Sequence, residues 1–322
     1  MLAVQALRAG GPEVLEPVEL GRPAPGPGQI LVRHEAIGLN YIDTYQRSGL
    51  YPMRYPAVLG QEGAGVVEAL GDGVTRFAPG DRVAYNSPGG AYAALHVVAA
   101  ARAVALPAGV SAEVAAASLL KGMTTEFLVR RCHPLRAGET ILVHAAAGGV
   151  GSLLVQWAKA IGATVIGTVG SEEKAALARG LGCDHVVLYR HEDVAARVKQ
   201  ITGGAGVSVA YDAVGKDTFE ATLASLGRRG LFVSFGNASG PAPAVEPLRL
   251  MRGGSLFLTR PTLADYTATP AELDESAGQL FAMIASGKLR VEIGQRFRLA
   301  DARQAHEALE GRRTIGASVL LP

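Results

Sequence analysis

The chain has few cysteines and no long hydrophobic run. Its only cysteines are Cys132 and Cys183, and neither lies in a CxxC motif or a Cys/His cluster. A disulfide framework and a zinc knuckle are therefore poorly supported, and two free thiols are typical of a reducing cytosol. No apolar run reaches the roughly 18 residues of a membrane span. Arg8 interrupts the first apolar stretch, which is wrong for a signal peptide. We expect a soluble, cytoplasmic protein.

A block of basic charge is also missing. The 31 basic and 29 acidic residues give a net charge of +2, and no Lys/Arg cluster stands out. A membrane partner is therefore not expected, and nucleic acid is a poor candidate for a partner. The composition, 48% hydrophobic and 19% charged, is that of an ordinary globular protein. At about 150 residues per domain, the length suggests two domains.

Two patterns of apolar residues divide the chain. In the first third, short apolar segments alternate with Gly/Pro-rich turns, which predicts an antiparallel sandwich or barrel. From Ile141 to Arg260, strands alternate with helices, which predicts βαβ crossovers and a buried parallel sheet. The predicted fold class is α/β, a Rossmann doubly wound parallel sheet plus a β-rich domain. After Pro261 we expect one amphipathic helix and short strand-like segments.

The stretch HAAAGGVG is the turn between the first of these strands and its helix. It matches the dinucleotide fingerprint G-x-G-x-x-G with Ala146, Gly148 and Gly151 at the key positions, Ala146 replacing the first glycine. Gly148 would let the backbone approach a pyrophosphate. Gly149 and Val150 would offer amide N–H groups at the positive end of the helix. The loop is therefore predicted to bind a dinucleotide.

The end of the next strand distinguishes NAD from NADP. It carries Gly170 and Ser171 where an NAD-selecting carboxylate would stand, and Lys174 follows in the first turn of the helix. Tyr189 ends the following strand within reach of the same place. A hydroxyl and a lysine suit a 2′-phosphate better than a 2′-hydroxyl. The predicted cofactor is therefore NADPH, the alternative being that Lys174 is an ordinary exposed lysine.

Together with the glycine loop, four further segments resemble the medium-chain dehydrogenase/reductase superfamily. The likeness runs over essentially the whole chain and is to the zinc-free, zeta-crystallin-like quinone oxidoreductases. The segments that carry it are AIGLNYIDTY (36–45), RSGLYP (47–52), SFGN (234–237) and LTRP (258–261).

This resemblance implies two domains. A discontinuous GroES-like catalytic domain would comprise residues 1–122 and 262–322, and a Rossmann NADPH-binding domain residues 123–261. The cofactor would lie in the cleft that they form.

The positions of the catalytic zinc ligands argue against a metal. Zinc dehydrogenases of this superfamily use a Cys and a His there, and the matching residues are Asn40 and Gln61. Neither is a usual zinc ligand, and the four-cysteine lobe of those enzymes is missing. No metal is therefore expected. Without one to stabilise an alkoxide, the easier reaction is hydride transfer to an acceptor that is already electrophilic, such as a quinone.

The function that the resemblance implies is therefore NADPH:quinone reduction. Two alternatives stay open. One is reduction of the activated double bond of an enone or alkenal by NADPH. The other is a non-catalytic role as a crystallin-like or RNA-binding protein that binds the nucleotide for stability.

The resemblance also assigns the remaining site residues. Tyr45 and Tyr51 would contact the quinone, unless they are simply boundary tyrosines of the β-rich domain. Lys121 is interpreted as an ordinary solvated lysine, the alternative being a residue that forms an inter-domain contact. The residues predicted to be catalytic are Asn40, Asp43, Tyr45 and Tyr51. Those predicted to bind the cofactor, beyond the residues already named, are Tyr41, Ile42, Thr124, Gly236, Asn237, Arg260, Pro261 and Arg312.

Strand 255–261 is the last of the alternating region and is predicted to lie at a sheet edge. Its apolar residues would invite pairing with a second copy of the chain. In the family this strand forms a two-fold dimer, so a homodimer is expected.

Overall fold

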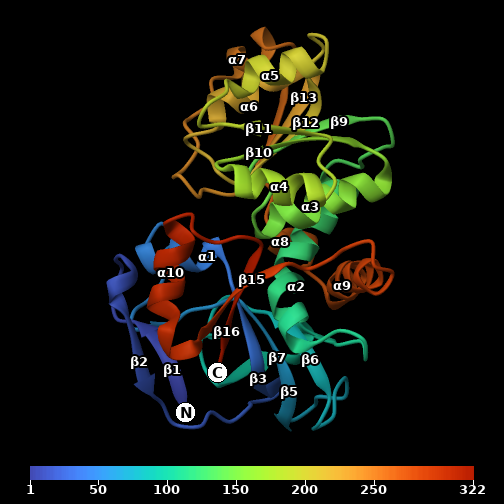
Figure 1. Cartoon of the computed structure of the whole chain (residues 1–322). Helices are drawn as coiled ribbons and strands as arrows, with labels where there is room; N and C mark the ends of the chain where they lie inside the picture. The colour runs from blue at the N-terminus through green and yellow to red at the C-terminus, as the bar shows by residue number, and fades with distance from the viewer. The chain divides into compact units, whose positions relative to one another are not determined.

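The computed structural model describes residues 1–322 and divides into two compact units (Figure 1). Unit 1 comprises Met1–Met123 and Thr267–Pro322, and unit 2 comprises Thr124–Tyr266. Tyr266 belongs to unit 2 because its ring stacks on Phe127, with the centroids 4.3 Å apart. No helix has the length and hydropathy needed to span a bilayer.

Unit 1 is built on two sheets whose strands are mostly antiparallel, because short apolar segments are joined by tight Gly/Pro turns. Their inward faces bury a core that includes Ile30, Val67, Tyr85 and Tyr92. The smaller sheet has the order β2 (Leu15–Glu19), β1 (Leu2–Ala6), β4 (Ala57–Val58). The larger sheet has the order β15 (Ile293–Arg298), β16 (Ala317–Leu321), β3 (Gln29–Leu39), β5 (Glu62–Leu70), β6 (Arg82–Asn86), β8 (Ala103–Ala105), with β7 (Leu95–Ala99) paired to β3.

The helices of unit 1 come from both ends of its sequence. They are α1 (Tyr41–Ser48), the first part of α2 (Ala112–Phe127), α9 (Pro270–Ala285) and α10 (Ala302–Glu310), with short 3₁₀ turns at Pro12–Val14, Ala100–Arg102 and Leu299–Asp301. The sequence predicted only strand-like segments after α9, and α10 is therefore a correction. Its buried face consists of the small Ala302 and Ala305 and of His306, which carry little hydrophobic signal.

Unit 2 is a parallel six-stranded sheet with helices on both faces, as predicted. Figure 1 shows α3 and α4 on one face and α5 and α6 on the other. The strand order is β11 (His185–Leu188), β10 (Thr164–Val169), β9 (Thr140–Val143), β12 (Val207–Asp212), β13 (Leu226–Ser234), β14 (Phe257–Thr259). The helices are α3 (Gly149–Ile161), α4 (Glu172–Gly180), α5 (Val194–Ile201), α6 (Phe219–Ser225), α7 (Pro247–Arg252) and α8 (Leu263–Tyr266), and a π-helical turn at Leu128–Cys132 continues α2.

The strand order reverses at β9, which pairs with β10 on one side and β12 on the other. In an open parallel sheet, ligands bind outside the carboxyl ends of the strands at such a reversal. The loop that follows β9 is the glycine-rich stretch, so the topology brings it to the position where a nucleotide is expected. The predicted edge strand is also an edge here, since β14 pairs only with β13.

Candidate cofactor and substrate site

The glycine-rich loop joins β9 to α3 and leaves the start of this helix open. Gly148 is the N-cap residue, with extended backbone (φ −86°, ψ 176°) and no side chain to cap the first turn. The N-cap residue therefore offers no side-chain acceptor to the first amide N–H groups of α3. Such amides, at the positive end of a helix, form a site for a phosphate group.

Two further residues of this loop explain its sequence. A Cβ atom on Gly151 would lie 2.2 Å from the Ala145 carbonyl oxygen, so only glycine lets α3 start this close to the turn. Ala146 fits in place of the first glycine because the left-handed conformation is taken by Ala145 (φ 52°). A Cβ on Gly167 of β10 would lie 2.7 Å from the Ala146 methyl group, so Gly167 leaves the space that this methyl group fills. The loop thus keeps the cradle that a pyrophosphate requires.

The residues predicted to bind a 2′-phosphate gather at the carboxyl end of β10. Ser171 caps α4 and accepts a hydrogen bond from the Lys174 backbone N–H (3.4 Å). The Tyr189 hydroxyl lies against Gly170, 2.6 Å from where a Cβ would stand. The structure therefore brings all four residues together, and none of them carries the carboxylate that favours NAD.

The other predicted cofactor residues of unit 2 follow later strands. Gly236 and Asn237 come after β13, and Gly236 packs against the Ala213 carbonyl oxygen in the loop after β12. Arg260 and Pro261 come directly after β14. Because the sheet is parallel, these loops lie at the same edge as the glycine-rich loop. Thr124, within α2, is the first residue of unit 2.

In unit 1, the predicted substrate residues lie on and beside α1. Asn40 is its N-cap, and Tyr41 and Ile42 open its first turn. The Tyr45 ring lies between those of Tyr41 (centroids 6.2 Å apart) and Tyr51 (5.3 Å, edge to face). The three tyrosines form a continuous aromatic wall.

Arg312 follows α10 in unit 1. Its backbone is in the left-handed region, with φ 57°.

Asp43 points into the interior of unit 1. Its Oδ2 accepts hydrogen bonds from the Asn40 N–H and the Tyr92 hydroxyl, both 2.9 Å long, and its Oδ1 has no partner. Tyr92 also hydrogen-bonds His306 Nε2 (2.9 Å), whose Nδ1 lies 3.0 Å from Arg47. Complete burial raises the pKa of Asp43 to about 7, although both hydrogen bonds lower it. Asp43 therefore caps the start of α1 from the interior of the unit.

Two charged residues of this region escaped the sequence prediction. Lys121 is only 5% exposed and forms an ion pair of 2.7 Å with the fully buried Glu62, so its assignment as a solvated lysine is wrong. The alanines at 115–117 are fully buried, which shows that α2 is enclosed on more than one face. This alanine run was the signal that a lysine of the same helix would be buried as well.

At the two positions that the resemblance assigns to zinc ligands, this chain has Asn40 and Gln61. No group of three or more His, Cys, Asp or Glu side chains that could hold a metal ion occurs. Asn40 donates from Nδ2 to Glu62 (2.8 Å).

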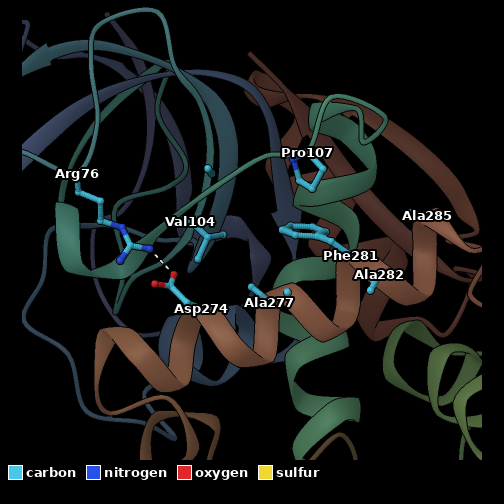
Figure 2. A pocket seen from close by; sticks show the side chains of 10 residues that line it. Arg76, Val104, Pro107, Asp274, Ala277, Phe281, Ala282 and Ala285 are labelled. Carbon is cyan, nitrogen blue, oxygen red and sulfur yellow. Dashed lines mark hydrogen bonds and ion pairs between the residues drawn. The ribbon is translucent and has the colours of Figure 1, made fainter.

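A cavity of about 420 Å³ in unit 1 lies apart from these residues. Figure 2 shows that α9 forms one side of it, with Phe281 and Ala277, and that Val104 and Pro107 line the other. Arg76 and Asp274 form an ion pair at one end. None of the predicted site residues lines this cavity.

Each unit matches a known family model. Residues 26–118 match the alcohol dehydrogenase GroES-like domain, and residues 149–274 match the zinc-binding dehydrogenase model. A GroES-like unit and a Rossmann unit in one chain define a medium-chain dehydrogenase/reductase.

Relatives that match over the full chain show to which family of this class the chain belongs. The quinone oxidoreductase of Pseudomonas aeruginosa is 54% identical, over 99% of each chain. The 2-haloacrylate reductase of a Burkholderia species is 42% identical, over 100% of this chain and 99% of its own. The crystal structure of Escherichia coli quinone oxidoreductase complexed with NADPH has a TM-score of 0.98 and 48% identity over 100% of both chains. The chain belongs to the quinone oxidoreductase family, which confirms the resemblance.

The raised pKa of Asp43 predicts a pH-dependent stability. The folded protein holds a proton on Asp43 up to about pH 7, whereas an unfolded chain releases it near the ordinary aspartate pKa of 3.8. The contribution of Asp43 to stability therefore falls as the pH rises through this range. Asp43→Asn keeps an acceptor for the Asn40 N–H and removes the titration. We expect urea unfolding to show that the difference in unfolding free energy, variant minus parent, is about 2 kcal/mol more positive at pH 7 than at pH 5. A difference that does not change with pH would contradict the assignment.

Proposed function

We propose that this protein is an NADPH:quinone oxidoreductase, which transfers a hydride from NADPH to a quinone without a metal. Relatives named quinone oxidoreductase that match the full chain support this function, and the structure of the Escherichia coli relative contains NADPH. The observation in this chain that carries it is the cradle at the start of α3, where Gly148 leaves the helix uncapped and Gly151 permits close packing.

The cofactor would be bound mainly by backbone groups and small side chains. The pyrophosphate would accept hydrogen bonds from the first N–H groups of α3, and the 2′-phosphate would meet Ser171, Lys174 and Tyr189. When bound, NADPH supplies the hydride, and the residues orient it. The further contacts that we propose are Tyr41, Ile42, Thr124, Gly236, Asn237, Arg260, Pro261 and Arg312.

The quinone would be held by the aromatic wall on α1. Tyr45 and Tyr51 would stack on the ring or donate a hydrogen bond to a quinone oxygen, and Asn40 would orient the acceptor. Hydride addition to a quinone gives a hydroquinone anion, which is stabilised by its aromatic ring and takes its proton from water. The residues therefore have to position the quinone, and the reaction requires neither a strong acid nor a metal.

Reduction of an activated double bond is the less favoured alternative. The relative named 2-haloacrylate reductase is 42% identical, against 54% for the Pseudomonas quinone oxidoreductase. A role in RNA binding has no support in the charge pattern, since the net charge is +2.

The function is tested by NADPH oxidation with 1,4-benzoquinone after dialysis against a chelator, with NADH and an alkenal run in parallel. We expect fast, NADPH-selective turnover of the quinone that survives dialysis. Turnover of the alkenal alone would transfer the assignment to double-bond reduction. Loss of activity on dialysis, with recovery on adding zinc, would overturn the metal-free mechanism.

Replacement of Lys174 tests the 2′-phosphate site. Lys174→Ala should weaken NADPH binding by about 1.5–3 kcal/mol, or roughly 10- to 150-fold, because a hydrogen bond to a charged group is lost. NADH binding, measured by the same fluorescence titration, should not change. Lys199→Ala, which removes an exposed lysine of α5 in the same unit, is the matched control. Equal losses for the two nucleotides would exclude a 2′-phosphate contact.

We also propose that two copies of the chain pair through the edge strand β14. This edge exposes large apolar side chains: Phe257 is 60% exposed, and Met251 of the neighbouring α7 is 59% exposed. The outer side of an edge strand presents unpaired backbone N–H and C=O groups, which can hydrogen-bond to a strand of a second copy of the chain. Light scattering should give a dimer, and Phe257→Lys should shift the mass toward the monomer at micromolar concentration. A parent protein that is monomeric at all concentrations would contradict the proposal.

A further inference from the structure

We propose that Lys121 is a positioning residue for hydride transfer to the quinone. Its ammonium group and the Glu62 carboxylate form a buried ion pair that holds the Asn40 carboxamide, and with it the start of α1. The inference rests on the proposed function, since Asn40 is proposed there to orient the acceptor.

The three side chains meet at one carboxylate oxygen. Glu62 Oε1 accepts hydrogen bonds from Lys121 Nζ (2.7 Å) and from Asn40 Nδ2 (2.8 Å). Its Oε2 accepts the Leu120 backbone N–H (2.7 Å). Glu62 comes from β5, Lys121 from α2, and Asn40 from the junction of β3 and α1. The carboxylate therefore ties three elements together.

The backbone around Glu62 prevents the carboxylate from moving away. A Cβ on Gly38 would lie 2.2 Å from Glu62 Oε1 and equally close to the Ala116 carbonyl oxygen. Strand β3 thus packs directly on the Glu62 side chain and on α2. Asn40 follows Gly38 by two residues, so the same close packing fixes both the carboxylate and the residue that it holds.

The pair is better explained by orientation than by stability. Burying two charges carries a desolvation cost that often cancels their attraction, and apolar residues of the same volume are commonly as stable. The surrounding core of unit 1 is apolar. A charge-assisted hydrogen bond is, however, stronger and shorter than a neutral one. It turns the Asn40 amide nitrogen toward Glu62 and its oxygen away, which fixes the carboxamide in one orientation.

The variant Lys121→Met removes the charge and keeps most of the side-chain volume. We expect kcat with 1,4-benzoquinone to fall at least tenfold, while the Kd for NADPH stays within twofold. The primary isotope effect on kcat with NADPH deuterated at C4 should rise, because the hydride step becomes more rate-limiting. Val98→Ala, which opens a cavity in the core of the same unit, is the control for destabilisation alone. It should lower Tm and leave kcat and the isotope effect unchanged below the transition.

A double variant separates folding from positioning. Lys121→Met leaves Glu62 without a counter-charge, and Glu62→Gln in the same chain removes that charge. The double variant should recover Tm but not kcat. Recovery of kcat together with Tm, or a kcat loss matched by Val98→Ala at equal Tm, would overturn the positioning role. If the parent enzyme itself reduced no quinone, the proposed function would fail first, and the variants would then carry no information on hydride transfer.

Discussion

Two buried acidic side chains hold the residue on which the substrate half of the site depends. Asp43 accepts the backbone N–H of Asn40, and Glu62 accepts its side-chain amide. Both side chains are fully buried, so neither can exchange these hydrogen bonds for bonds to water. Asn40 is thereby fixed at its backbone and at its side chain, and the direction in which α1 leaves β3 is fixed with it. The tyrosines of the aromatic wall take their positions from this start.

The same hydrogen bonds explain why the end of the chain returns to unit 1. From Asp43 they continue through Tyr92 and His306 to Arg47, which is 2% exposed and forms a two-pronged ion pair with Glu310 (2.7 and 2.9 Å). A buried guanidinium without this partner would be strongly destabilising. Helix α10 thus supplies the counter-charge for Arg47, while β16 pairs with β3 and Leu299 and Leu320 join the core, so the end of the chain stabilises unit 1 in three ways.

The sequence predicted the features that depend on short spacing, and it missed those that depend on distant partners. The βαβ alternation and the glycine loop lie in consecutive residues, so the parallel sheet and its nucleotide-binding loop could be predicted. The alanine run of α2 indicates that Lys121 is buried, but its partner Glu62 lies about sixty positions away, and no local pattern reveals such a pair. The tolerance of Ala146 likewise depends on Gly167 of the next strand. The site residues stay predictions, although their neighbourhoods are now defined.

Burial also determines how unit 1 responds to acid. It lowers the pKa of His34 and His96 to about 4 and that of His306 to about 3, so these imidazoles stay neutral when folded. Below pH 6.5 the unfolded chain takes up their protons, and stability falls on acidification toward pH 4. Asp43 has the opposite slope, because its pKa is raised. The three histidines with lowered pKa values together outweigh the single Asp43 carboxyl whose pKa is raised, because the shifts are of similar size and each contributes to stability in proportion to its size. Acid therefore destabilises the unit, whereas near pH 7, where these histidines are largely neutral in the folded and the unfolded chain, the contribution of Asp43 has the opposite slope.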